Sequence, residues 1–159
     1  MIGALLLALA APAPSSLPAI VRVATPAVAI VAGERGEIEI VASITEGFRI
    51  QANPASEPFL VPARLELPGD GRVRVGAPVY PPGKAYRLRG ADEDLSVYEG
   101  RLVIRVPLEA RAAAGDESPG ETVLDGRLHY QACNELVCLR PSSAAVQVRV
   151  SLRPSLPGR

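Results

Sequence analysis

Residues 28–41 read Val28-Ala29-Ile30-Val31-Ala32-Gly33-Glu34-Arg35-Gly36-Glu37-Ile38-Glu39-Ile40-Val41, two apolar runs on either side of a glycine-containing turn. In the second run, isoleucines alternate with glutamates. Because successive side chains of a β-strand point to opposite faces, this alternation predicts a strand with one buried and one solvated face. The glycines at 33 and 36 are typical of a hairpin turn. We therefore expect residues 28–31 and 37–41 to form a β-hairpin.

Short runs of the same kind continue along the chain, and 16 prolines and 14 glycines separate them. Residues 110–120 contain Gly115, Pro119 and Gly120, which favour a loop over a helix. Frequent turns between valine-rich runs predict an all-β fold, a β-sandwich of about eight or nine short antiparallel strands. The further strands are expected at residues 47–50, 59–62, 64–67, 72–75, 86–88 (a short edge strand), 102–106, 122–130 and 144–152.

Length and charge narrow the classes of function. A chain of 159 residues is long enough for one domain with a proper core. Lysine plus arginine and aspartate plus glutamate both number 17, so the net charge is zero. This balance argues against binding to nucleic acid or to an anionic membrane surface. No pattern indicates a cofactor, a metal or a small-molecule substrate.

The N-terminal residues 1–13 are apolar but too short to span a bilayer as a helix. They resemble the hydrophobic region of a secretory signal peptide, with Ala8-Leu9-Ala10 as the cleavage site, although no Lys or Arg precedes them. The alternative is a buried N-terminal strand or helix. We expect a signal-peptide-like segment and linker at 1–19, a sandwich domain at 20–153 and a tail at 154–159.

The two cysteines, Cys133 and Cys138, are the only ones in the chain, and four residues separate them. Thiols this close in sequence can meet at disulfide distance if the loop turns back. Closing so short a ring stabilises a fold by about 2 kcal/mol, against about 4 for a bridge between distant strands. Redox exchange is therefore favoured over a structural clasp. A metal site with His129 is the third alternative, but this spacing does not match common zinc patterns.

Four further segments of the chain form a recognisable set. They are Tyr130-Gln131-Ala132-Cys133 with Cys138 and Pro141, Leu95-Ser96-Val97-Tyr98-Glu99-Gly100, Val79-Tyr80-Pro81-Pro82-Gly83-Lys84, and Gly47-Phe48-Arg49-Ile50-Gln51-Ala52-Asn53-Pro54. Together they resemble the N-terminal domain of the bacterial thiol:disulfide interchange protein DsbD. The resemblance covers residues 27–150, and its most specific part is the segment that contains the two cysteines.

The resemblance implies an immunoglobulin-like sandwich in the periplasm that acts as part of a protein-disulfide reductase. Its cysteine pair would take electrons from a membrane donor and pass them to thioredoxin-like periplasmic proteins. By similarity, Cys138 forms the mixed disulfide with a partner and Cys133 resolves it. Val97 and Tyr98 match the cap over the pair, and Val97 stands where some members carry a larger aromatic residue. We expect a monomer, either a free-standing version of the domain or a fragment.

The residues around the cysteines predict little activation of either thiol. A strand and loop offer no helix dipole to favour a thiolate. Glu135 inside the loop opposes thiolate formation, and Arg140 beside it favours thiolate formation. The acidic run Asp92-Glu93-Asp94 is expected to be a solvated turn. An immunoglobulin-like binding or structural domain with a clasp disulfide remains the alternative, because fold alone cannot separate the two functions.

Overall fold

The computed structural model describes residues 19–24, 26–111 and 119–155. Within these residues every regular element is a strand, and twelve strands form three sheets. Their bounds are β1 (Val21–Ala24), β2 (Ala27–Val31), β3 (Arg35–Ile44), β4 (Arg49–Gln51), β5 (Arg64–Glu66), β6 (Val73–Val75), β7 (Lys84–Tyr86), β8 (Leu95–Tyr98), β9 (Arg101–Ala110), β10 (Gly120–Tyr130), β11 (Ala132–Cys133) and β12 (Ser142–Arg153).

Two four-stranded sheets make the sandwich. The first has the order β1-β3-β9-β6, and the second has the order β2-β12-β10-β5. Their long central strands alternate buried and exposed side chains, as β3 does from Ile38 to Ile44. The buried faces of β3, β9, β10 and β12 form one core, in which Ile40, Ile104, Leu128 and Val148 are fully buried. The prediction of an all-β, immunoglobulin-like sandwich is confirmed.

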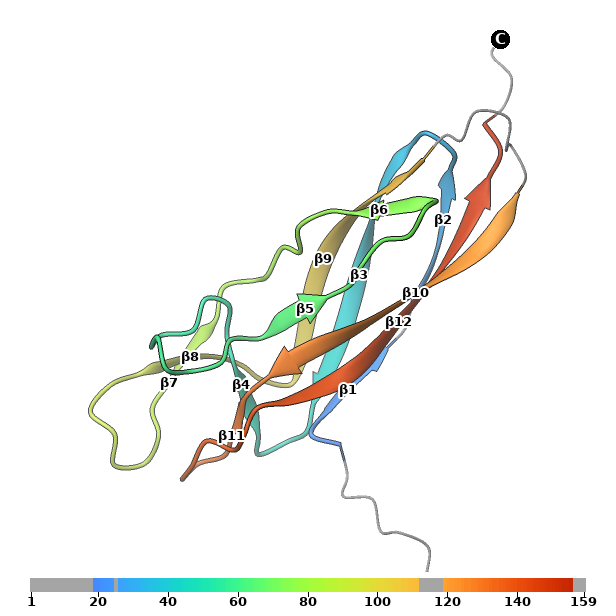
Figure 1. Ribbon diagram of the computed structural model, residues 1–159. Helices are drawn as coiled ribbons and strands as arrows, with labels where there is room; N and C mark the ends of the chain where they lie inside the picture. Colours follow the sequence, from blue (N-terminus) through green and yellow to red (C-terminus); the bar gives the residue numbers. More distant parts are fainter. Residues whose placement is uncertain (1–18, 25, 112–118, 156–159) are drawn as a thin grey trace, which may run out of the picture.

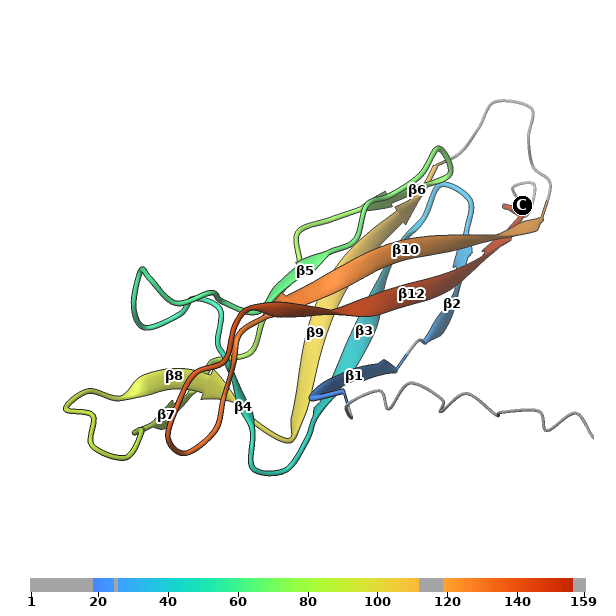
Figure 2. The ribbon, with the colours of Figure 1, turned by 60° about the horizontal axis from the view of Figure 1, so that its bottom comes forward.

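The third sheet, β11-β4-β8-β7, is small and lies at one end of the sandwich. Figure 2 shows it with the loop that follows β10, at the end away from the start of β10 and the end of β12. β10 and β12 pair without interruption from Gly120–Leu152 to Tyr130–Ser142. The cysteine loop is therefore attached to the end of a long, continuously hydrogen-bonded ribbon (Figure 1).

The predicted hairpin between β2 and β3 is wrong, although the turn between them is real. Gly33 takes the left-handed conformation (φ 83°), and the amide of Glu34 bonds the carbonyl of Val31 at 2.9 Å. The turn carries the chain from one sheet to the other instead of joining neighbours. β2 pairs with β12, and this pair is parallel, whereas all other strand pairs in the described residues are antiparallel.

Other strand predictions hold to different degrees. The expected strands at 64–67, 72–75, 102–106, 122–130 and 144–152 are present as β5, β6, β9, β10 and β12. The edge strand expected at 86–88 is β7, two residues earlier, and it does lie at a sheet edge. The prediction of a strand at residues 59–62 is wrong, because this segment belongs to the irregular connection between β4 and β5, which turns at residues 58–59. The predicted signal-peptide segment and linker, except for residue 19, and residues 112–118 of the predicted loop lie outside the described residues.

Candidate functional site

The end of β10 and the strand β11 set the position of the first cysteine. After Tyr130, the carbonyl of Gln131 accepts a hydrogen bond from the amide of Gln51 at 3.0 Å. β11 then pairs with β4, so that Ala132 lies opposite Ile50 and Cys133 opposite Arg49. The chain thus leaves the sandwich and joins the small sheet within two residues of the end of β10.

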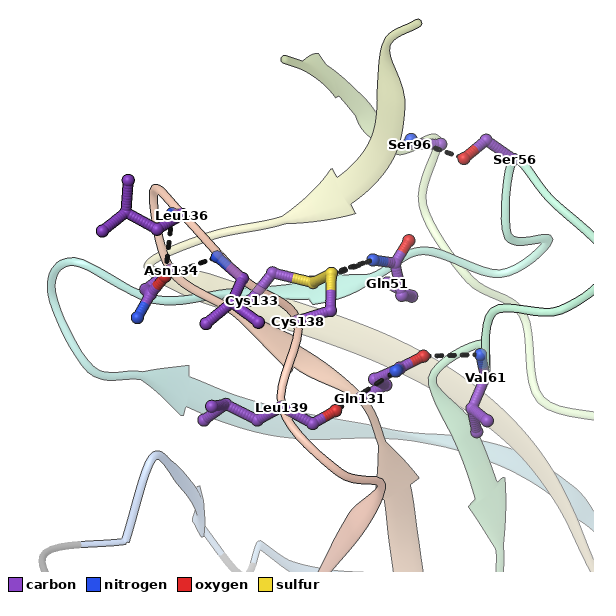
Figure 3. Close-up of a disulfide and its surroundings, with 11 residues drawn as sticks. Gln51, Ser56, Val61, Ser96, Gln131, Cys133, Asn134, Leu136, Cys138 and Leu139 are labelled. Carbon is purple, nitrogen blue, oxygen red and sulfur yellow. Dashed lines mark hydrogen bonds between the residues drawn. A yellow bond between two sulfur atoms is a disulfide. The ribbon is translucent and has the colours of Figure 1, made fainter. Parts of the chain in front are cut away.

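The loop between the cysteines closes on the side chain of Asn134. Its Oδ1 accepts a hydrogen bond from the backbone amide of Leu136 at 2.9 Å (Figure 3). The same oxygen accepts from the backbone amide of Val137 at 2.9 Å, and the backbone amide of Asn134 donates to the carbonyl of Val137 at 3.0 Å. This turn brings Cys138 directly opposite Cys133, and the two form a disulfide. The prediction that Cys133 and Cys138 can come within disulfide distance is therefore confirmed.

The two sulfur-bearing residues differ in exposure. Cys133 is fully buried, whereas Cys138 is half-buried. Cys133 is buried but is not part of the main core cluster, although its neighbour Ala132 in β11 is. Leu136 and Val137, beside Cys138, expose 69% and 51% of their surface. Cys138 is therefore the more accessible of the two cysteines, and it lies next to two exposed apolar side chains.

Gln51 is a site residue that inspection of the sequence missed. Its Nε2 donates toward Cys133 Sγ at 3.1 Å and lies 3.8 Å from Cys138 Sγ (Figure 3). The residue is fully buried. A glutamine in a three-residue strand carries no signal by itself, and only the pairing of β4 with β11 reveals its place. The one sequence signal is that Arg49 and Gln51 are two residues apart, which places two polar side chains on the same face of the strand.

The proposed cap residues Val97 and Tyr98 are both buried in β8, but they face opposite sides. Val97 pairs with Gln51, so by strand alternation its side chain shares the face of Gln51. Tyr98 belongs to the main core, and its hydroxyl donates to Pro81 O at 2.8 Å and accepts from Asn53 N at 3.1 Å. Burial raises the pKa of Tyr98. The structure thus places Val97 on the disulfide side and Tyr98 on the core side.

The connection between β7 and β8 contacts the loop between the cysteines. The amide of Arg89 bonds the carbonyl of Glu135 at 3.2 Å, and the two side chains form an ion pair at 3.2 Å. The predicted effect of Glu135 on the thiols is therefore offset by a cation from another segment. Asp94, in the acidic run before β8, pairs with Arg87 at 2.7 Å, and the whole run is exposed, as expected of a solvated turn.

Arg49 is, after Gln51, a second residue near the disulfide whose position the sequence does not reveal. It lies opposite Cys133 in the sheet, and its guanidinium stacks on the ring of Tyr86 at 3.8 Å. Its Nε is 3.3 Å from a Glu99 carboxylate oxygen. Lys84 reaches the same carboxylate group at 3.4 Å. These contacts connect β4, β7 and Glu99, the residue that follows β8.

His129 takes no part in a metal cluster with the cysteines. Its Nε2 lies 3.0 Å from the Glu66 carboxylate, across the β10–β5 pair. Among the described residues no three His, Cys, Asp or Glu side chains are grouped as metal ligands would be. In the same residues no helix is long and apolar enough to cross a membrane.

Comparison with known proteins gives one matching family and similar solved structures. Residues 24–149 match the family model of the thiol:disulfide interchange protein DsbD, N-terminal. A similar solved structure is the reduced N-terminal domain of DsbD from Neisseria meningitidis, with 17% identity and a TM-score of 0.41, covering 78% of this chain and 86% of that one. Another is the CooA pilin subunit of enterotoxigenic Escherichia coli, with 11% identity, a TM-score of 0.30, and coverage of 86% and 100%.

No curated protein gives a significant match to the chain. The family model spans most of the sandwich, the small sheet and both cysteines, well over half of the sequence. The chain therefore belongs to the family of the N-terminal domain of the thiol:disulfide interchange protein DsbD.

Proposed function

We propose that this thiol–disulfide exchange domain relays electrons through Cys133 and Cys138 between a membrane or soluble reductant and other extracytoplasmic thiol–disulfide proteins. The observation that carries the proposal is the place of the disulfide. It closes a loop at one end of the sandwich, with one half-buried sulfur-bearing residue, and it links neither of the two large sheets to the other.

This placement suits exchange better than stabilisation. A ring this short contributes about 2 kcal/mol by loop-closure arithmetic, and the main core is complete without the cysteines. An accessible disulfide is also easily attacked by a thiolate, which is the first step of exchange. The exposed side chains of Leu136 and Val137 give a partner an apolar surface beside Cys138.

The exchange proceeds in two steps in the proposed mechanism. A partner thiolate attacks Cys138 Sγ, the new intermolecular disulfide forms, and the electron pair of the broken bond passes to Cys133 Sγ. A second thiol of the partner then attacks the partner's own sulfur and releases Cys138 as a thiolate, so that two electrons have entered the domain. In the reverse direction, Cys138 attacks a partner disulfide and Cys133 resolves the mixed species.

Membership of the family supports thioredoxin-like proteins as partners. A membrane protein is our proposal for the electron donor. We place the exchange domain at residues 20–153, with export directed by the segment before it. The alternative is a binding or structural domain in which the disulfide only clasps a loop.

Equilibration with a glutathione buffer separates the two functions. We expect the pair to pass between disulfide and dithiol in the folded domain, with reduction lowering the free energy of unfolding by about 2 kcal/mol. Circular dichroism measured along the titration should show the same β-sheet signal in both redox states. A disulfide that resists reduction until the sheet signal is lost would establish the clasp and exclude exchange.

The cap proposal predicts a change in thiol accessibility. Replacing Val97 by glycine removes a buried side chain from the face that Gln51 shares with the sulfurs. We expect the reduced variant to react about fivefold faster with a small alkylating agent, because less apolar surface covers the thiols. Val73→Gly is the matched control, since this equally buried valine lies in the first large sheet. Equal acceleration by both substitutions would mean general loosening, not loss of a cap.

A further inference from the structure

The carboxamide of Gln51 is poorly satisfied by the oxidised domain. Its Nε2 faces the two sulfurs, at 3.1 Å from Cys133 and 3.8 Å from Cys138 (Figure 3). Its Oε1 is buried and has no hydrogen-bond partner in the part of the chain that the structure describes. A disulfide sulfur is uncharged and is a weak acceptor, and a buried carbonyl oxygen without a partner costs stability.

Nothing in the backbone requires a polar side chain at this position. The backbone amide of Gln51 donates to the backbone carbonyl of Gln131, and the backbone carbonyl of Gln51 accepts from the amide of Ala63, both at 3.0 Å. Leucine or methionine would keep these bonds, fill nearly the same volume and avoid the unpaired oxygen. Local violations of this kind concentrate at functional sites. The presence of a glutamine at this position is therefore best explained by the contacts of its Nε2 with the two sulfurs.

The opposite orientation of the amide would not improve the oxidised state. It would place Oε1 against two sulfurs that carry no hydrogen to donate. The orientation with Nε2 toward Cys133 is thus the favourable one, and it aims a donor at an atom that becomes charged when the disulfide opens. Hydrogen bonds to a charged acceptor are about twice as strong as those between neutral groups.

We propose that Gln51 is the hydrogen-bond donor that stabilises the Cys133 thiolate formed when the disulfide is broken. This inference rests on the proposed exchange function. Cys133 is fully buried, and burial disfavours a thiolate that has no polar partner. When a partner thiolate bonds to Cys138, the electron pair of the Cys133–Cys138 bond moves onto Cys133 Sγ, where the Gln51 N–H already points. A stabilised leaving thiolate leaves faster.

The pH dependence of the redox equilibrium tests this role. The oxidised-to-reduced ratio against glutathione is measured from pH 6 to pH 9 for the wild type, Gln51→Leu and Gln51→Met. The donor acts on the thiolate and not on the thiol, so the variants should match the wild type near pH 6. At pH 9 they should be about tenfold harder to reduce, which is about 30 mV for a two-electron couple.

Gln131→Leu is the matched control. Gln131 also holds the cysteine loop, with Oε1 accepting from Val61 N at 3.0 Å and Nε2 donating to Leu139 O at 3.2 Å, and no hydrogen bond joins it to either sulfur. Its loss should change the equilibrium by the same factor at every pH. A pH-independent factor in the Gln51 variants would overturn the inference and leave exchange intact. A wild type that never equilibrates with glutathione would instead overturn the proposed function.

A measurement on the unchanged protein covers the case in which both Gln51 variants fail to fold. In the reduced wild type, the side-chain amide resonances of Gln51 should move with pH together with the ionisation of Cys133, followed by its Cβ chemical shift. In the oxidised protein they should stay constant over the same range. Gln51 resonances that ignore pH in the reduced state would contradict the contact with a thiolate.

Discussion

Replacing Cys133 by alanine is expected to trap the domain on its partner as a stable mixed disulfide. Cys138 remains half-buried beside the exposed Leu136 and Val137, so attack at this position is retained. The resolving thiol is missing, so the intermolecular bond persists. The sharpest partner is a thioredoxin-like protein that keeps one cysteine of its pair, loaded with a chromogenic thiol. Cys138 displaces this thiol, and a non-reducing gel then shows the covalent complex.

The reciprocal variant supplies the control. In Cys138→Ala the remaining thiol belongs to the fully buried Cys133, so it should yield little complex under the same conditions. The wild type should release the chromogenic thiol and then the free partner, because Cys133 resolves the bond. Trapping by Cys138→Ala and not by Cys133→Ala would reverse the two roles. Trapping by neither variant would favour the binding-domain alternative.

Gly83→Val is expected to be the most damaging single substitution near the site. A Cβ at Gly83 would overlap Ser96 Oγ and lie 2.6 Å from Ala52 Cβ. The glycine therefore allows the segment leading into β7 to pack against β8 and the end of β4. Overpacking of this kind costs about 3 kcal/mol, because backbone must move. Urea unfolding should show the loss, and alkylation of the reduced thiols should be faster where β7 and β8 separate from β4.

The effect should depend on crowding and not on the loss of a glycine. At Gly71, in the turn before β6, a Cβ meets no atom within 4 Å, and Gly71→Val should leave both stability and alkylation near wild type. If Gly83→Val unfolds like the wild type in urea, the close packing described for this corner is wrong. Loss of stability with unchanged alkylation would mean that the hairpin β7–β8 does not shield the sulfurs.

The long strands could be predicted from the sequence because their burial follows a period of two. β3, β9, β10 and β12 all alternate, and the sandwich follows from them. The hairpin prediction failed for a physical reason. The Gly33 turn determines where the chain reverses, but it does not determine which strand β2 pairs with. That choice depends on which strand edge is free, and β2 pairs with the free edge of β12.

The candidate site divides in the same way. Cys133 and Cys138 could be paired from sequence, because a short loop brings them together without the rest of the fold. Gln51 and Arg49 could not be placed, because a three-residue strand has no measurable period and their contacts depend on its pairing with β11. Polar residues in so short a run are ordinarily expected to be solvated, and here a neighbouring strand covers Gln51.

The lengths of the strands at the sheet borders have a consequence for self-association. The four strands of ten to twelve residues are all interior, whereas the border strands β1, β2, β5, β6, β7 and β11 have between two and five. An unpaired row of backbone donors and acceptors is a template for aggregation in proportion to its length. Short border strands offer other copies little backbone to extend, so we expect the domain to resist edge-to-edge stacking at high concentration, although Leu136 and Val137 are exposed.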